Sequence, residues 1–427
     1  MKRGNAAKIT GWMHMMKHGQ GVAWVLAVAA CMHGAAESAC RDAREWVTSW
    51  HAAQQVPETQ NAVPAGVSQD STLREIVHLT SGGGEVRIRL SNAYGQSVMH
   101  LQTVHLAQAM SASSPEIRRG TDHVLQFGGS TEVAIPAGAE YVSDPIAMAV
   151  SPGEDLTVSI YYMALPSIVT GHPGSRATSY FMRGNAVGDD SYHAALRAEH
   201  WYLLSTVEVN TRGATIVALG DSITDGHGST TNGNDRWTDA LAGRLQTAYA
   251  TCSYGVANAG IGGNHLLSDG LGPNALARFD RDVLAEAGVR WVIVLEGVND
   301  LGGLTESVSA TPEAHRQLVK RILAAYDQLI ARAHAQGVKI IGATITPYAG
   351  SGYYHPDAAN EADRQAVNRW IRASGKFDDV IDFDAAVRDP EHEDRLLPAY
   401  DCGDHLHPSP SGYKAMADAI SLKIFEY

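Results

Sequence analysis

Cysteines and long hydrophobic runs are scarce in this chain, and each scarcity excludes a class of protein. Four cysteines in 427 residues are too few for a fold held together by disulfides. No apolar run approaches the roughly 20 residues of a membrane-spanning helix, so we expect no membrane span. Acidic residues outnumber basic ones by 46 to 33, and the formal net charge of −13 argues against a nucleic-acid partner. Only 7 % of the residues are aromatic, although the eight tryptophans leave room for aromatic contacts with a ligand.

The first forty residues have the pattern of an export signal. Their start is basic, residues 21–30 (GVAWVLAVAA) form an apolar core, and the small residues that follow fit cleavage after Ala36. Residues 28–31 (VAAC) are also similar to a bacterial lipobox, which would place a lipid anchor on Cys31. We therefore predict that residues 1–40 are a signal peptide or a lipoprotein signal. The protein is then exported, to the periplasm or the extracellular space.

The remaining cysteines allow at most one disulfide. With Cys31 removed or lipidated, Cys40, Cys252 and Cys402 are left, an odd number that leaves a spare thiol. The spacing does not decide which pair would form. None of them lies in a CxxC pattern, so neither a zinc site nor a redox role is indicated.

The N-terminal half has the pattern of an all-β domain. Val86, Ile88 and Leu90 alternate with Arg87 and Arg89, which is the period-two signature of a half-buried strand. Glycine- and proline-rich turns recur across residues 45–210, and no helical period appears there. A chain of this length suggests two domains. We predict that residues 45–210 form a β-sandwich or jelly-roll accessory domain.

Three residues of this half have two interpretations each. Trp46 and Trp50, in WVTSWHAA, either pack in the core or form an aromatic platform for sugar or aryl rings. His172, in TGHPGS, lies in a turn-like stretch, and we interpret it as a surface histidine that could instead reach a neighbouring site.

The C-terminal half alternates between strands and helices. Apolar runs predict buried strands at 214–219, 254–257, 291–295, 338–343 and 380–381. Amphipathic stretches predict helices between these strands, one of them beginning at Thr311 and ending at Gly337. Such alternation is typical of a doubly wound parallel sheet, which we expect for residues 211–427.

Four polar clusters lie after predicted strands, three of them directly and the fourth further along the chain. They are residues 220–226 (GDSITDG), 258–264 (NAGIGGN), 296–300 (EGVND) and 404–408 (DHLHP). The carboxyl ends of parallel strands meet at one edge of a sheet, so these clusters should converge there. A serine hydroxyl is a weak nucleophile that needs a neighbouring base. We predict that His407 takes the proton of Ser222 and that Asp404 orients His407.

The same clusters offer donors for the oxyanion of an acyl-transfer reaction. The backbone amides of Ser222 and Gly263 and the side-chain amide of Asn299 are the candidates. Losing one such donor typically costs about 2.7–4 kcal/mol of transition-state stabilisation. The sequence therefore predicts a complete acyl-transfer site in residues after Thr211, and we expect the β domain not to be needed for the chemical step.

The four motifs GDSITDG, NAGIGG, GVND and DHLHP resemble, in order, the four blocks of the SGNH (GDSL) hydrolase superfamily. The resemblance implies a flavodoxin-like α/β/α fold and ester hydrolysis through a serine, with no metal and no cofactor. By motif, Ser222 is similar to the nucleophile, Gly263 and Asn299 to the oxyanion-hole residues, and Asp404 and His407 to the rest of the triad. The first block reads GDSI in place of GDSL, a conservative change.

The flanking sequence also resembles a subfamily of arylesterases and acylhydrolases associated with xylan utilisation. SITDGHGST, GPNALARFDRD and the β-rich front half carry this likeness. It implies short-acyl or aryl esters, or acylated plant polysaccharides, as substrates. The acyl group and the alcohol are not fixed by it.

Alternatives to a serine esterase use the same residues. Asp401, Asp404, His405 and His407 together could bind a metal ion, although a triad explains most of this set. The protein could instead be a carbohydrate-binding protein with a relic hydrolase domain, or an acyltransferase. We interpret Glu296 as a buried carboxylate that pairs with Arg236 or a backbone amide.

Overall fold

The computed structural model describes residues 44–193, 195–248, 251 and 253–426. Residues 45–427 form one compact unit. The predicted export signal, with Cys31, and the cysteines at positions 40 and 252 lie outside the described residues. In the described ranges, no helix has both the length and the apolar character that crossing a membrane requires.

The N-terminal region consists of two main antiparallel sheets, as the sequence predicted. The first sheet has the order β1 (Glu45–His51), β15 (Leu204–Thr211), β3 (Gly83–Ser91), β8 (Glu140–Val142), with β9 (Ile146–Val150) also paired to β3. The second has the order β13 (Leu196–Ala198), β12 (Ser179–Arg183), β2 (Gln69–His78), β10 (Asp155–Ala164), β5 (Thr103–Gln108), β6 (His123–Val124). Two short pairs complete the region: β4 (Met99–Leu101) with β7 (Val133–Ile135), and β11 (Gly171–His172) with β14 (Trp201–Tyr202).

The two main sheets enclose a common core. Ile88 and Leu90 of β3 are fully buried and pack in the same cluster as Leu73 of β2 and Val158 of β10. Trp50 is buried as well, with its ring 4.8 Å from that of Trp201 in an edge-to-face contact. The region is therefore a sandwich, and Trp50 packs inside it.

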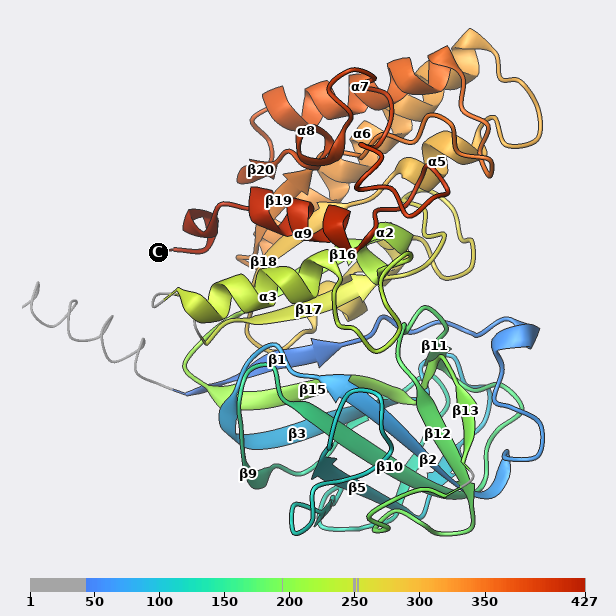
Figure 1. Cartoon of the computed structure of the whole chain (residues 1–427), viewed down its shortest axis with the longest axis vertical. Helices are drawn as coiled ribbons and strands as arrows, with labels where there is room; N and C mark the ends of the chain where they lie inside the picture. Colours follow the sequence, from blue (N-terminus) through green and yellow to red (C-terminus); the bar gives the residue numbers. More distant parts are fainter. Residues whose placement is uncertain (1–43, 194, 249–250, 252, 427) are drawn as a thin grey trace, which may run out of the picture. The chain divides into compact units, whose positions relative to one another are not determined.

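The outer face of the first sheet packs against the α/β region. Strand β1 lies beside β17 (Gly255–Gly260) of that region (Figure 1). Ala52, just after β1, forms a parallel bridge with Asn258. The Arg89 guanidinium lies 3.0 Å from the buried Glu286 carboxylate, which also accepts a hydrogen bond of 2.8 Å from the Thr48 hydroxyl. The polar face of β3, a strand predicted to be half-buried, is therefore part of an interface.

The C-terminal region is a parallel five-stranded sheet with helices, which confirms the predicted architecture. The strand order is β17 (Gly255–Gly260), β16 (Thr215–Gly220), β18 (Val289–Leu295), β19 (Lys339–Ala343), β20 (Asp379–Ile381). The helices are α2 (Ser222–Asp225), α3 (Trp237–Thr247), α4 (Ala275–Phe279), α5 (Val298–Gly303), α6 (Pro312–Ala335), α7 (Ala358–Ala373), α8 (Phe383–Val387) and α9 (Pro410–Ala419). Short 3₁₀ helices lie at Thr59–Asn61 and Leu422–Phe425, and a short π-helix lies at Asp280–Leu284. Helix α3 packs with α9, and α6 packs with α7.

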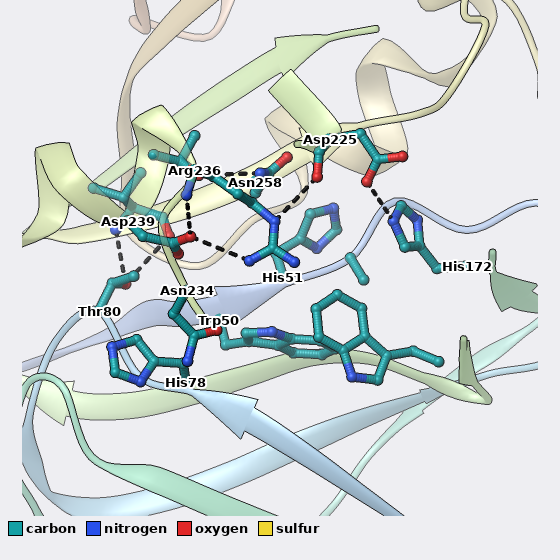
Figure 2. A pocket seen from close by; sticks show the side chains of 14 residues that line it. Trp50, His51, His78, Thr80, His172, Asp225, Asn234, Arg236, Asp239 and Asn258 are labelled. Carbon is teal, nitrogen blue, oxygen red and sulfur yellow. Dashed lines mark hydrogen bonds and ion pairs between the residues drawn. The ribbon is translucent and has the colours of Figure 1, made fainter. Parts of the chain in front are cut away.

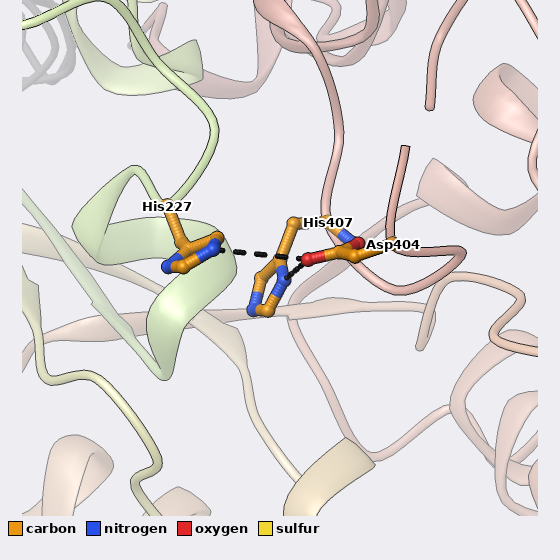
Figure 3. Close-up of side chains that lie close together, drawn as sticks. All are labelled: His227, Asp404 and His407. Carbon is orange, nitrogen blue, oxygen red and sulfur yellow. Dashed lines mark hydrogen bonds and ion pairs between the residues drawn. The ribbon is translucent and has the colours of Figure 1, made fainter. Parts of the chain in front are cut away.

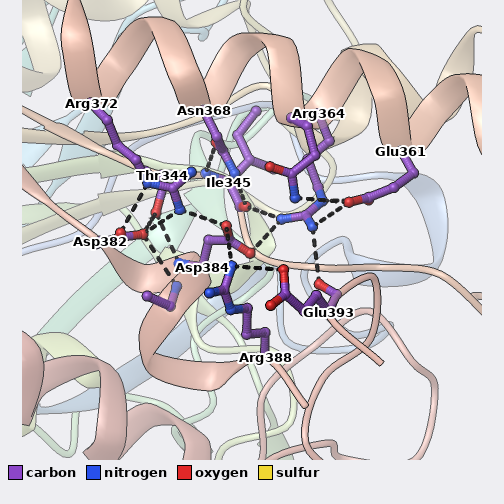
Figure 4. A network of polar contacts seen from close by, with 12 residues as sticks. Thr344, Ile345, Glu361, Arg364, Asn368, Arg372, Asp382, Asp384, Arg388 and Glu393 are labelled. Carbon is purple, nitrogen blue, oxygen red and sulfur yellow. Dashed lines mark hydrogen bonds and ion pairs between the residues drawn. The ribbon is translucent and has the colours of Figure 1, made fainter. Parts of the chain in front are cut away.

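A buried polar network fixes the chain where it leaves β19 (Figure 4). The fully buried Arg364 of α7 donates to Asp384 of α8 at 2.7 Å and to the carbonyl of Ile345 at 2.9 Å. Arg372 lies 2.6 Å from the same Asp384, and Asn368 accepts the Ile345 amide at 2.8 Å. Buried charges are tolerated when they are paired and hydrogen-bonded. The network holds the start of the loop that lines the site described next.

Candidate active site

Ser222 lies at the turn between the central strand and a short helix. Strand β16 ends at Gly220, and the Asp221 side chain caps α2 by accepting the Ile223 amide at 2.9 Å. Ser222 is the first residue of that helix, and Gly226 ends the helix with a φ of 102°. This turn places the serine at the carboxyl edge of the parallel sheet, as predicted.

The structure brings Ser222, His407 and Asp404 into one hydrogen-bonded chain. Ser222 Oγ lies 2.8 Å from His407 Nε2, and His407 Nδ1 lies 2.6 Å from Asp404 Oδ2. A carboxylate can only accept, so Nδ1 carries the ring proton and Nε2 is free to accept from the serine hydroxyl. Burial opposes ionisation of Asp404, but hydrogen bonds from His407 hold its pKa below the ordinary value. The arrangement suits the activation of a serine nucleophile.

The oxyanion candidates share a cavity with the serine. Ser222, Gly263 and Asn299 all line a cavity of about 820 Å³. Gly263 lies in the turn after β17 with a φ of 66°, a conformation that favours glycine. Asn299 Nδ2 donates to the carbonyl of Asn264 at 2.6 Å, and its Oδ1 accepts from the Tyr354 hydroxyl at 2.6 Å. Because Nδ2 carries two hydrogens, one remains to donate to a ligand.

One wall of this cavity comes from the β region. The residues from that region are Gln55, Glu58, Asn61, Pro173, Gly174, Arg176 and His200. They come from three places in the sequence, before β2, after β11 and just before β14, and most of them are polar. The sequence did not indicate these residues, because no local pattern marks a residue of the β region that lines a cavity of the α/β region.

His172 joins the β region to the helix that carries Ser222 (Figure 2). Its Nε2 lies 2.8 Å from Asp225 Oδ1, and its Nδ1 lies 2.7 Å from the carbonyl of Ala53. Only 3 % of His172 is exposed, so the interpretation as a surface histidine is wrong. Gly174 approaches so closely that a Cβ there would lie 1.8 Å from Asp225 Oδ2, so a larger residue would have to displace the Asp225 side chain. Asp225 also shapes this junction through its carbonyl, which accepts from Arg236 at 3.0 Å.

Arg278 is a further structural residue that the sequence did not single out. It is buried and donates to the carbonyls of Gly220 at 2.9 Å and Ala259 at 2.6 Å, so it ties the ends of β16 and β17 together. It also lies 3.4 Å from Glu296, which therefore pairs with Arg278 and not with Arg236. Burial, opposed by Arg278, raises the pKa of Glu296 well above its ordinary value and that of Asp221 to about 7.

A second histidine flanks the base (Figure 3). The ring of His227 lies 4.0 Å from that of His407, and its Nε2 lies 3.7 Å from Asp404 Oδ2. Arg176 Nη2 lies 2.9 Å from His227 Nδ1, and it can only donate. Partial burial and the cationic neighbours His407 and Arg176 lower the pKa of His227 to about 4. The ring is therefore neutral over the ordinary working range.

The alternative metal set is only partly brought together. Asp401 accepts from His405 Nδ1 at 2.6 Å, whereas His407 is bonded to Ser222 and Asp404. Within the described ranges, the groups whose ligand atoms lie within 4.8 Å of one another are His227 with Asp404 and His407, and Asp401 with Cys402 and Asp404. Each of these two groups contains only two of the four residues in the predicted metal set. Both nitrogens of His407 already have hydrogen-bond partners. Cys402 is a free, exposed thiol.

The fold and the site together define a class of protein. A parallel sheet between helices, with a serine, a histidine and glycine- and asparagine-bearing loops at its carboxyl edge, is an α/β/α hydrolase architecture. Residues 218–415, somewhat less than half of the chain, match the GDSL-like Lipase/Acylhydrolase family. The α/β region is therefore similar to GDSL-like lipases and acylhydrolases, and the protein is a carboxylic ester hydrolase.

Solved structures of the same kind align with about half of this chain. A GDSL-like lipase from Bacteroides thetaiotaomicron is 20% identical, with 49% of this chain and 87% of that one covered and a TM-score of 0.36. The acetylxylan esterase Axe2 from Geobacillus stearothermophilus is 23% identical, with 50% and 96% covered and a TM-score of 0.37. The acetyl xylan esterase AlAXEase is 24% identical, with 48% and 96% covered and a TM-score of 0.35. Among curated proteins, none matches this chain.

Proposed function

We propose that this protein is an exported serine esterase that cleaves carboxylic esters through an acyl-enzyme. The observation that carries the proposal is the continuous hydrogen-bonded chain from Ser222 Oγ through His407 to Asp404 in the wall of the large cavity. The division into an accessory domain at 45–210 and a catalytic domain at 211–427 belongs to this proposal, as does export by the signal at 1–40.

The reaction proceeds in two symmetric halves. Ser222 Oγ attacks the ester carbonyl while His407 Nε2 takes its proton, and Asp404 stabilises the imidazolium that forms. The carbonyl oxygen gains the negative charge and accepts hydrogen bonds from the amides of Ser222 and Gly263 and from Asn299 Nδ2. His407 then gives its proton to the leaving alcohol. Water repeats the sequence on the acyl-enzyme, releases the acid and restores the serine, without a metal or cofactor in any step.

The substrate class follows from the cavity and from the sequence resemblance. A cavity of about 820 Å³ suits a small or medium-sized ligand. Its β-region wall is rich in hydrogen-bonding side chains, which suits an alcohol part with several hydroxyl groups. Together with the likeness to xylan-associated acylhydrolases, this supports short-acyl or aryl esters and acylated plant polysaccharides as substrates.

Replacing Ser222 by alanine tests the nucleophile. We expect Ser222→Ala to abolish hydrolysis of p-nitrophenyl acetate without unfolding the protein, because only one hydroxyl is lost, at the first residue of a short helix. Wild-type enzyme given a slow substrate should show an acyl adduct on the peptide that contains Ser222. Ser151→Ala, at an exposed position in a turn of the β region, is the matched control and should keep full activity.

Two results would contradict this proposal. Folded Ser222→Ala with near-wild-type turnover would remove the serine from the reaction. Activity that a chelator abolishes and zinc restores would instead favour metal-assisted hydrolysis. Comparison of acetyl, butyryl and feruloyl esters with acetylated xylan then narrows the substrate.

A further inference from the structure

The side chain of Asn299 must be oriented for it to act in the oxyanion hole. The oxygen and nitrogen ends of an amide have nearly the same shape, but only the nitrogen can donate to an oxyanion. An amide that turned its oxygen toward the cavity would repel the charge it is expected to stabilise. Two groups flank Asn299, the carbonyl of Asn264 at 2.6 Å from Nδ2 and the hydroxyl of Tyr354 at 2.6 Å from Oδ1.

We propose that Tyr354 is a positioning residue that holds the amide of Asn299 in its donating orientation. The inference rests on the proposed function, in which Asn299 binds the oxyanion. A carbonyl can only accept, so the Asn264 carbonyl requires that the NH₂ end of Asn299 face it. Oδ1 then faces Tyr354, whose hydroxyl must donate. The two contacts fix both ends of the amide and leave one Nδ2 hydrogen for the ligand.

The ring of Tyr354 is itself held rigidly. Only 4 % of Tyr354 is exposed, and Asn299 is 2 % exposed. The ring packs on α5, where a Cβ at Gly302 would lie 2.3 Å from the tyrosine Cγ. Tyr348 and Tyr353 make edge-to-face contacts with it at 6.4 and 4.7 Å between ring centroids. A hydroxyl on such a ring has little freedom to leave Asn299.

The protonation state of Tyr354 supports a donor role. Burial, with further contributions from Tyr353 and Asp221, raises the pKa of Tyr354 above its ordinary value. The hydroxyl therefore keeps its proton at every pH at which the enzyme would work. Donors that are aimed before the reaction begins need no reorganisation as charge develops. Loss of this hydroxyl should thus affect the chemical step and leave substrate binding nearly unchanged.

A double-mutant cycle between Tyr354 and Asn299 tests the proposal. The variants are Tyr354→Phe, Asn299→Ala and the double variant, assayed for kcat and KM with p-nitrophenyl acetate. We expect Asn299→Ala to lower kcat by about 10²- to 10³-fold, as loss of an oxyanion donor does. Tyr354→Phe should lower kcat by about tenfold with KM nearly unchanged, because the donor remains but is less well oriented. In the Asn299→Ala background, Tyr354→Phe should have no further effect.

Two further variants separate positioning from a general loss of structure. Tyr162→Phe removes another buried hydroxyl, which donates to the Val67 carbonyl at 2.7 Å inside the β-sandwich, and should leave kcat unchanged. Gly302→Ala pushes on the Tyr354 ring without touching its hydroxyl, and should reproduce the selective loss of kcat. Thermal unfolding of every variant shows whether it is folded.

The outcomes distinguish this inference from the proposed function. If Asn299→Ala keeps wild-type kcat, Asn299 is not in the oxyanion hole, and both the inference and that part of the proposed function are wrong. If Asn299→Ala loses activity but Tyr354→Phe does not, only the positioning role is wrong. If the two losses multiply in the double variant, Tyr354 acts independently of Asn299, which also overturns the inference.

Discussion

Replacing His172 by alanine should destabilise the protein and slow hydrolysis, although His172 lies in the β region. Its imidazole is buried between the Ala53 carbonyl and the Asp225 carboxylate, at 2.7 and 2.8 Å. Asp225 is the last residue of α2, the helix that begins with Ser222, and its side chain is also buried. The substitution leaves a buried carboxylate without its partner at the end of the helix that holds the serine.

The expected magnitude follows from the burial of this pair. Breaking a buried ion pair by removing one partner typically costs about 3–5 kcal/mol, because the remaining charge is uncompensated. Replacing the charge as well should recover part of that loss. We therefore expect His172→Ala to lower the free energy of unfolding by about 3–5 kcal/mol, and His172→Ala with Asp225→Asn to lower it by less than His172→Ala alone. Urea unfolding of the two variants measures both quantities.

The activity assay separates a local effect from a global one. His315 and Asp363 form another buried histidine–carboxylate pair, 2.5 Å apart, between α6 and α7. His315→Ala should cost a similar free energy of unfolding and leave kcat of the folded protein unchanged. His172→Ala should lower kcat for p-nitrophenyl acetate even where the protein is fully folded. Unchanged kcat in His172→Ala would refute the reasoning, and so would a double variant less stable than His172→Ala.

Two other perturbations test the surroundings of the site. Arg176→Gln should raise the pKa of His227 from about 4 by about one unit, because one screened charge contact in water is worth about 1 kcal/mol. An NMR titration of the His227 ring in the wild-type protein and in Arg176→Gln measures this change, and an unchanged pKa of His227 would contradict the prediction. Asp384→Ala should lower the free energy of unfolding by about 3 kcal/mol, since it leaves the buried Arg364 with less compensation, and a loss below about 1 kcal/mol in urea unfolding would be too small for this network.

Sequence alone determined the architecture and the convergence of the main site residues. Alternating apolar residues indicate a strand that is buried on one face, and a continuous apolar run indicates a strand that is buried on both. The β-sandwich and the parallel sheet could therefore both be predicted. In a parallel sheet all carboxyl ends meet at one edge, which is why the motifs around Ser222, Asn299 and His407 could be placed together before the structure was known. The bonds between Ser222, His407 and Asp404 have the predicted connectivity, and their catalytic roles stay predictions.

Only the tertiary structure decided which residues from other layers complete the site. Tyr354 lies 55 positions from Asn299, and His172 lies 53 from Asp225, in segments with no motif of their own. Arg89 occupies the polar face of a regular alternating strand, yet it pairs with the buried Glu286 because another layer covers that face. The position of a residue within a strand or helix determines which face of that element it occupies. What lies opposite that side depends on how the layers pack, and periodicity within one segment carries no record of it.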